Sequence, residues 1–209
     1  MTSAPVRVTA LFLDIGGVVL TNGWDRTMRR QAAERFGLDL AELDERHSLF
    51  AGAFEDGKMS LDEYLARVVF HAGRPFTPDD FKAFMFAQSR PYPEMLDLVR
   101  ALKARHRLKL VAVNNEGREL NEYRIRTFRL AELIDAFVSS CFIGSRKPAP
   151  EIYRAALDIS QVPVAQVAYL DDREPLVEVA RGLGMHGIHH TGYASTRAGL
   201  AALGLSMDA

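Results

Sequence analysis

Short runs of apolar residues, spaced along the chain and separated by helical patterns, constrain this sequence most strongly. The clearest runs cover residues 8–13, 108–113, 167–170 and 187–189, and a weaker one covers 136–139. Runs that are apolar at most positions, rather than only at alternate ones, predict strands buried on both faces of a parallel sheet. Because amphipathic helical patterns fall between them, we expect a doubly wound α/β fold.

Helix signals fill the stretch between about residues 22 and 91, where we find no strand pattern. Ser60 followed by Glu63 has the spacing of a capping box. Thr77 and Pro78 indicate an N-cap followed by proline at the first helical position. We therefore expect a helical insert after the first strand. Ligands bind at the carboxyl edge of such sheets, so an insert there is placed to act as a lid.

Chain length, net charge and cysteine content limit the kind of protein this can be. A chain of 209 residues can form one α/β domain plus an insert. Its net charge of −1 gives no basic footprint for nucleic acid or an anionic membrane. We find no charged leader before a long apolar stretch, and no apolar run of the roughly 20 residues that span a bilayer. Cys141 is the single cysteine and cannot form an internal disulfide, which fits a reducing compartment, so we expect a cytoplasmic protein. We expect it to be a monomer or a homodimer.

Polar residues that can carry chemistry follow the predicted strands. Asp14 comes directly after the first strand, and Gly16 and Gly17 let the backbone turn sharply and approach a ligand closely. An isolated aspartate in this position is more often a turn residue or a helix cap. The functional interpretation of Asp14 therefore depends on what lies at the ends of the other strands.

The next two strand ends carry amide and ammonium groups. Asn114 and Asn115 follow the second strand, and such asparagines are common in turns. Their amide hydrogens can also be donated to an oxyanion, beside the positive N-terminal end of the next helix. Lys147 stands before Pro148, which fixes the local backbone. A loop lysine is usually just solvated, but Lys147 could neutralise a phosphate and a nucleophilic carboxylate together.

The Asp171–Asp172 pair is the most specific of these signals. Adjacent carboxylates after a buried strand repel one another, and a metal ion explains them better than a helix cap does. Magnesium takes hard oxygen ligands, typically one or two carboxylates with waters and a substrate phosphate. A sheet with the strand order 3-2-1-4-5 would bring all four polar segments to one edge. The combination therefore predicts a single site.

With these motifs the chain resembles the haloacid dehalogenase superfamily over nearly its whole length. The resemblance implies that Asp14 is the nucleophile and that Lys147 is the lysine this family has before a proline. It also implies that Asp171 and Asp172 form the acidic motif that holds magnesium. Asn114 falls where the family usually has serine or threonine, and an amide can still donate to a phosphate.

The same resemblance implies an architecture and an activity. It implies a Rossmann-like core over residues 1–20 and 92–209 and a helical type-1 cap over residues 21–91. Residues 54–60 resemble a cap segment of small sugar-phosphate phosphatases and of the N-terminal domain of epoxide hydrolase. The expected activity is Mg²⁺-dependent hydrolysis of a small phosphorylated compound through an aspartyl phosphate. The expected metal ligands then include Asp14 and the backbone carbonyl of Gly16.

One position departs from the family pattern. Gly16 stands where family phosphatases have a second aspartate, which protonates the leaving group and then activates water. Loss of such a group typically costs about 10²–10⁴-fold in rate. Glu116 is our candidate replacement; alternatively, the substrate is an acyl phosphate or another compound with a good leaving group. A catalytically impaired protein that binds a phosphorylated metabolite is a further alternative.

A haloacid dehalogenase, which also lacks the second aspartate, is a weaker alternative. The Asp171–Asp172 pair would place two extra negative charges beside an anionic substrate.

Substrate contacts are expected from the insert. Asn22, Trp24 and Arg26 follow the first strand and could face the pocket, although Trp24 also fits a core aromatic of the cap. We expect Arg124, Arg126 and Arg118 at the surface or at an interface, with Arg118 near enough to the loop to touch an anionic substrate. The histidines, His47 among them, lack the spacing of metal ligands, and we expect them to be structural or exposed.

Overall fold

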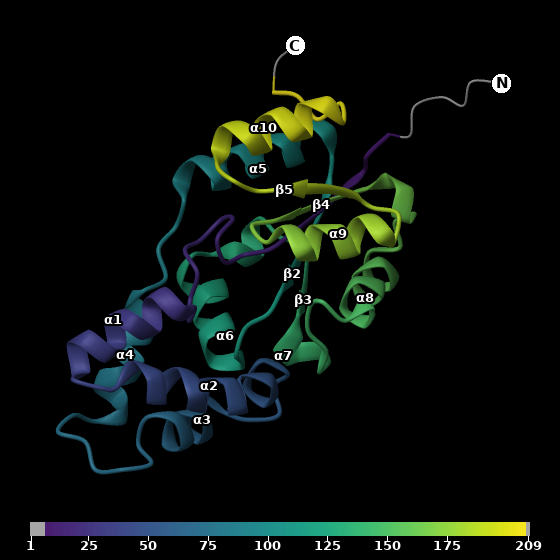
Figure 1. Ribbon diagram of the computed structural model, residues 1–209. Coiled ribbons are helices and arrows are strands. Elements are labelled where there is room, and N and C mark those ends of the chain that lie inside the picture. Colours follow the sequence, from purple (N-terminus) through teal and green to yellow (C-terminus); the bar gives the residue numbers. More distant parts are fainter. Residues whose placement is uncertain (1–6, 208–209) are drawn as a thin grey trace.

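A five-stranded parallel sheet forms the centre of the protein (Figure 1). The computed structural model describes residues 7–207, so residues 1–6 and 208–209 of the expected core domain lie outside the described residues. The strands are β1 (Ala10–Leu13), β2 (Lys109–Asn114), β3 (Ala136–Ser139), β4 (Val167–Asp171) and β5 (His186–His189). Their order is β3-β2-β1-β4-β5, which confirms the predicted fold class and strand order.

Helices cover both faces of this sheet. On one face, α5 (Pro93–His106) and α10 (Tyr193–Ala202) pack on one side-chain cluster. On the other, α8 (Pro150–Ser160) and α9 (Glu174–Gly182) pack on a second cluster. The remaining elements after β2 are α6 (Arg118–Thr127), α7 (Ser140–Ile143), and the 3-10 turns η1 (Leu130–Glu132) and η2 (Val164–Gln166).

Alternate residues of β1 explain why both faces are buried. Leu11 and Leu13 belong to the cluster under α5, while Ala10 and Phe12 belong to the cluster under α8, and the whole strand is buried. A strand with this pattern needs helices on both sides. None of the helices between residues 7 and 207 is long and apolar enough to cross a bilayer.

The insert after β1 is helical, as predicted. It contains α1 (Arg26–Phe36), α2 (Leu40–Glu55), α3 (Leu61–Val68) and α4 (Pro78–Ala87), which gather away from the sheet in Figure 1. The predicted capping box starts α3, and a second one starts α4. These helices bury a separate apolar cluster, to which α6 contributes Leu120. We propose on this basis that residues 21–91 form a cap domain.

The sequence patterns did not reveal every helix. Although α2 is the longest helix of the insert, its apolar residues do not form one stripe, and only Leu43 and Phe54 of it are buried. Small residues dominate α10, of which Thr196 and Leu200 are buried. A helix with so few buried apolar positions leaves little periodic signal in the sequence.

The insert and the sheet domain touch where α2 ends. Phe54 is buried there, and its ring stacks on Tyr64 of α3 with centroids 4.4 Å apart. A Cβ atom at Gly117, the N-cap residue of α6, would overlap the Phe54 ring. Nearby, the Glu119 carboxylate accepts a 2.9 Å hydrogen bond from the backbone N–H of Leu61. Glycine is therefore needed for this close approach.

This contact predicts the effect of one methyl group. At Gly117, φ is −65° and ψ is 146°, which alanine also adopts, so Gly117→Ala adds no backbone strain. The methyl group must displace Phe54, and we expect a loss of about 1–3 kcal/mol in the free energy of unfolding. Urea denaturation measures this. A Cβ atom at Gly73 would meet nothing within 4 Å, so Gly73→Ala is the control; equal stability of both variants would contradict the packing described.

Candidate active site

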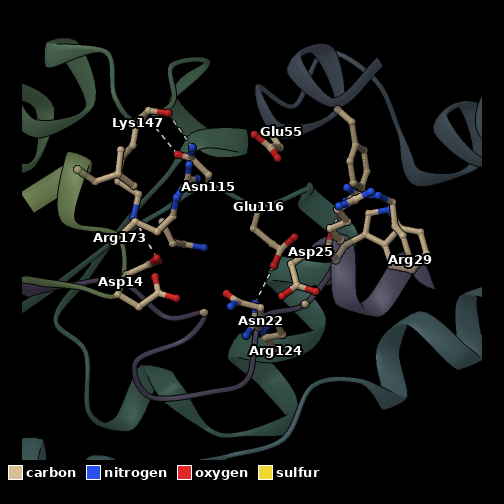
Figure 2. A pocket seen from close by; sticks show the side chains of 18 of the residues that line it. Asp14, Asn22, Asp25, Arg29, Glu55, Asn115, Glu116, Arg124, Lys147 and Arg173 are labelled. Atoms are coloured by element: carbon tan, nitrogen blue, oxygen red, sulfur yellow. Dashed lines mark hydrogen bonds and ion pairs between the residues drawn. The ribbon is translucent and has the colours of Figure 1, made fainter. Parts of the chain in front are cut away.

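The polar strand ends meet at one edge of the sheet, as the strand order predicts. Asp14 directly follows β1, Asn114 ends β2 and Asp171 ends β4. Between this edge and the insert lies a cavity of about 540 Å³. Figure 2 shows Asp14 and Lys147 on one side of it, Arg29 on the opposite side, and Glu116 pointing in between them.

Three carboxylates converge at the sheet side of the cavity. One oxygen each of Asp14, Asp171 and Asp172 lies within 4.8 Å of the other two. The ammonium Nζ of Lys147 lies 3.1 Å from Asp14 Oδ2 and 2.7 Å from Asp171 Oδ2. One cation does not balance three anions, so the cluster retains negative charge. Oxygen ligands of this kind and charge suit Mg²⁺.

Burial and like charges disturb the protonation of these groups. Burial, with Asp171 and Asp172 nearby, raises the pKa of Asp14 from 3.8 to about 7, although Lys147 opposes the shift. Burial and Asp171 also raise the pKa of Asp172, against a hydrogen bond from Asn22. For Lys147, burial lowers the pKa, but the attraction of Asp14 and Asp171 outweighs it and the net shift is upward. A second cation would relieve the repulsion among the acids.

The two adjacent aspartates have different surroundings. Asp171 is fully buried, and its Oδ2 accepts hydrogen bonds from Lys147 Nζ at 2.7 Å and from the Tyr169 hydroxyl at 2.6 Å. Its Oδ1 accepts from the Arg173 N–H at 2.9 Å. Asp172 instead lines the cavity, together with Asp14 and Gly16. The geometry therefore favours Asp14 and Asp172 as direct metal ligands and gives Asp171 the role of holding Lys147.

Gly17 allows Asp172 to reach this position. Its φ of 71° lies in the left-handed region, and a Cβ atom there would overlap the Asp172 carboxylate. Glycine is the residue that meets both conditions without strain.

Asn114 and Asn115 line the cavity, but their hydrogen bonds in the structure are made to other residues of the protein. Asn114 Nδ2 donates to Asn121 Oδ1 at 3.0 Å, and Asn114 Oδ1 accepts from the Ser139 hydroxyl at 2.8 Å. Asn115 bonds the backbone of Lys147 twice: Nδ2 donates to its carbonyl at 2.9 Å, and Oδ1 accepts from its N–H at 2.8 Å. Asn115 thus fixes the loop that carries the lysine. Phosphate binding by Asn114 and Asn115 stays a prediction, carried by the second hydrogen of each amide.

A neighbouring amide fills the space beside Gly16. A Cβ atom at Gly16 would lie 2.8 Å from Asn22 Oδ1 and 3.7 Å from Arg124 Nη1. The place from which the family's second aspartate would extend is therefore taken by Asn22. An amide can position groups there but cannot exchange a proton as a carboxyl does.

Glu116 and Arg124 form a buried ion pair in the cavity wall. Arg124 Nη1 lies 2.7 Å from Glu116 Oε2, and their side chains are 2% and 9% exposed. Burial raises the pKa of Glu116, and Arg124 opposes that shift. The expectation that Arg124 lies at the surface is wrong. Its guanidinium also donates to the Thr21 carbonyl, so the inward face of α6 can hold a charge because partners neutralise it.

Of the other predicted substrate contacts, some line the cavity and one does not. Trp24 lines the cavity, and its Nε1 donates to Tyr64 while its ring packs in the apolar cluster of the insert. It is thus a core aromatic of the insert, and its contact with substrate stays a prediction. Arg26 also lines the cavity but is mostly exposed and pairs with Asp44. Arg118 is not among the residues of the cavity wall; it donates to the Cys141 carbonyl at 2.7 Å.

Several cavity residues were not singled out from the sequence as pocket residues. Asp25, Arg29, His47, Glu55 and Arg173 complete much of its wall. They come from α1 and its N-cap, from α2 and from the loop before α9, and each lies among other charged residues of similar pattern in the sequence. The exception with a usable signal is Arg173, which directly follows the acidic pair.

The raised pKa of Asp14 predicts a pH-dependent stability. Its pKa rises from 3.8 to about 7 on folding, so the native state holds the proton more tightly. Stability is therefore lost as pH rises from about 4 to 7. In metal-free buffer, we expect the Tm of Asp14→Asn, relative to wild type, to increase between pH 5 and pH 8. Asp158→Asn, at an exposed site on α8, is the control; a pH-independent difference for Asp14→Asn would contradict the assigned environment.

Two known phosphatases are similar to this chain in sequence. D-ribitol-5-phosphate phosphatase of Bacteroides thetaiotaomicron is 26% identical over 194 residues, covering 83% of this chain and 87% of that protein. A sesquiterpene phosphatase of Aspergillus oryzae is 26% identical over 191 residues, covering 90% and 92%.

Structural comparison gives the same fold. A haloacid dehalogenase family enzyme of Bacteroides thetaiotaomicron, crystallised with magnesium and inorganic phosphate, superposes with a TM-score of 0.70. The match covers 90% of this chain and 95% of that one at 19% identity, which establishes a common fold. A sequence model of haloacid dehalogenase-like hydrolases matches residues 8–184, which include β1 to β4 and every candidate site residue. The chain therefore belongs to the haloacid dehalogenase-like hydrolase family.

Proposed function

We propose that this protein is a magnesium-dependent phosphatase that hydrolyses a small phosphorylated compound through an aspartyl phosphate on Asp14. The observation that carries the proposal is the Asp14 carboxylate at the cavity wall, 3.1 Å from Lys147 and within the acidic cluster. The phosphatase names of the two relatives support the reaction class, and the magnesium and phosphate in the similar crystal structure support the cofactor.

The residues present fit a magnesium ion. Asp14 and Asp172 offer carboxylate oxygens, and Gly16, in the same wall, offers a backbone carbonyl. We propose these groups as the ligands, with Asp171 behind them. Bound there, the ion would neutralise charge between Asp14 and a substrate phosphate oxygen.

The chain's own residues then account for phosphoryl transfer. An Asp14 oxygen attacks phosphorus in line with the leaving oxygen, the new P–O bond forms, and the bond to the leaving group breaks. Lys147 and the Asn114 and Asn115 amides stabilise the phosphoryl oxygens. Water then attacks phosphorus, which releases inorganic phosphate and restores the Asp14 carboxylate.

Glu116 is the carboxyl group we propose for the proton transfers. Its Oε2 lies 2.7 Å from Arg124 Nη1, and the same nitrogen is 3.7 Å from where a Cβ atom of residue 16 would be. Glu116 thus lies on the side of the cavity from which the family's second aspartate would act. It protonates the leaving oxygen in the first step and takes a proton from water in the second. Burial, which raises its pKa, suits the first role; Arg124, which favours its charged form, suits the second.

Two alternatives are less well supported. A dehalogenase would bind an anionic substrate beside Asp14, Asp171 and Asp172, of which only one charge is balanced by Lys147. A binding protein without turnover would gain nothing from an Asp14 carboxylate beside Lys147 in the cavity wall, and the feature that favours this alternative is Gly16. A cytoplasmic location and a monomeric or homodimeric state stay predictions from the sequence.

The nucleophile assignment predicts loss of turnover in Asp14→Asn. The amide is a poor nucleophile, so hydrolysis of para-nitrophenyl phosphate in the presence of Mg²⁺ should fall to background, and chelation of the metal should do the same to the wild type. Asp158→Asn again serves as the control and should retain wild-type kcat. Phosphatase activity that survives in Asp14→Asn would exclude the mechanism.

The role of Glu116 predicts a dependence on the leaving group. Glu116→Gln should lower kcat by about 10²–10⁴-fold on an alkyl phosphate, a poor leaving group that needs a proton. It should have a much smaller effect on the release of para-nitrophenol, measured as the initial burst in rapid mixing. Glu122→Gln, on the exposed side of α6, should leave both rates unchanged. Equal losses on the two substrates, or none, would dispose of the acid role.

A further inference from the structure

A chain of hydrogen bonds in the insert ends at the cavity wall. Trp24 Nε1 donates to the Tyr64 hydroxyl at 2.8 Å, and that hydroxyl lies 2.7 Å from Nδ1 of His47. Trp24 and Tyr64 are buried in the apolar cluster of the insert. His47 lies on α2 and lines the cavity. The chain therefore connects the apolar core of the insert to the space that a substrate would occupy.

The direction of the bonds fixes the tautomer of His47. An indole N–H can only donate, so the Tyr64 oxygen accepts from Trp24. If His47 Nδ1 also carried a hydrogen, both neighbours would donate to this oxygen, and the Tyr64 hydroxyl hydrogen would be buried without an acceptor. Tyr64 is fully buried, and such an unmet donor is costly. His47 Nδ1 is therefore the acceptor, and the hydrogen of the neutral ring is on Nε2.

The ring stays neutral under physiological conditions. Burial, assisted by the nearby Arg29, lowers the pKa of His47 to about 4, while Asp44 opposes the shift. At neutral pH the side chain thus presents one N–H donor and no charge. Within residues 7–207, no group forms a hydrogen bond with His47 Nε2, and this nitrogen is not among the fully enclosed polar atoms. A fixed donor on the cavity wall is available to a ligand.

An acceptor lies on the same helix face. Glu55 follows His47 by about two turns of α2, lines the same cavity and has a pKa raised by burial. Arg146 lies 3.3 Å from its Oε2. A hydroxyl group both donates and accepts, so a ligand with several hydroxyls can satisfy His47 and Glu55. An apolar ligand would cover both polar groups and leave them unpaired.

We propose that His47 is a specificity residue whose Nε2–H donates to a hydroxyl oxygen of the substrate's leaving group, so that the protein selects hydroxylated phosphate esters over apolar ones. This proposal rests on the proposed phosphatase function. It gives Tyr64 a positioning role, because Tyr64 sets which nitrogen of His47 carries the hydrogen. It also gives His47 a function beyond the structural role expected from the sequence.

Two esters of equal chain length test the selectivity. Erythritol 4-phosphate and n-butyl phosphate have four carbons each and differ in their hydroxyl groups. We expect wild type to have the higher kcat/KM for erythritol 4-phosphate, and His47→Phe to lower the ratio of the two values about 10-fold or more, mainly through KM. His47→Gln, whose amide N–H can replace Nε2–H, should restore part of the ratio. His186→Gln, on β5, should not change it. An unchanged ratio in His47→Phe would overturn the proposal.

The tautomer has a spectroscopic test that needs no turnover. In ¹⁵N-labelled protein at pH 7, the two nitrogens of His47 should show the chemical shifts of the Nε2–H form. In Tyr64→Phe they should move towards a mixture of tautomers, with a smaller selectivity ratio. Thermal denaturation checks that Tyr64→Phe is folded. A hydrogen on Nδ1 in the wild type would overturn the assigned donor.

A failure of the proposed function would be recognisable separately. If wild type hydrolysed neither ester nor para-nitrophenyl phosphate, the phosphatase proposal would fail. The His47 proposal then depends on titration with the two esters and Mg²⁺ in the same NMR experiment. Erythritol 4-phosphate should shift the His47 Nε2–H signal, and n-butyl phosphate should not. Equal responses to both esters would refute the role of His47 in selectivity.

Discussion

The ammonium group of Lys147, held between Asp14 and Asp171 inside the protein, is the interaction on which the site depends. Removing charged groups from water is costly, and here the cost is met by close opposite charges and by hydrogen bonds from Tyr169 and the Arg173 backbone. Asn115 holds the loop that carries the lysine. The sheet supplies the rest, because adjacent parallel strands bring their ends together. The fold of the sheet therefore places the groups of the site beside one another.

Lys147 does not balance the charge of all three carboxylates, and the remaining negative charge favours the binding of a cation. The pKa of Asp14 is raised to about 7, and the Asp172 carboxylate faces the cavity. A protein that maximised stability would not keep three carboxylates together. Such local conflict is typical of functional sites, where binding of a cation or substrate relieves it. The Glu116–Arg124 pair shows a second, internally balanced charge distribution on the far side of Gly16.

The fold could be predicted from the sequence because apolar strand runs alternate regularly with helical patterns. Most residues of the strands are apolar, and the acids lie at strand ends: Asp14 directly after β1 and Asp171 at the end of β4. Lys147 lies farther on, in the loop after β3 and α7. The strand order therefore predicts that these segments come to one edge of the sheet. The features that the sequence did not predict depend on contacts between residues far apart in the chain. Arg124 has the sequence pattern of an exposed helix residue, and only the fold reveals Glu116 and Thr21 beside it. The tautomer of His47 depends on Tyr64 and Trp24, whose pairing no local pattern encodes.

The proposed mechanism requires Asp14 to be a nucleophile beside a divalent cation held by the acidic cluster. A crystal structure of the protein with Mg²⁺ and beryllofluoride, a mimic of the phosphoryl group on aspartate, tests it most directly. We expect beryllium bonded to an Asp14 oxygen, with Mg²⁺ between that group and Asp172 and with Lys147 contacting a fluorine. Beryllofluoride attached elsewhere, or a metal ion bound away from Asp14 and Asp172, would contradict it.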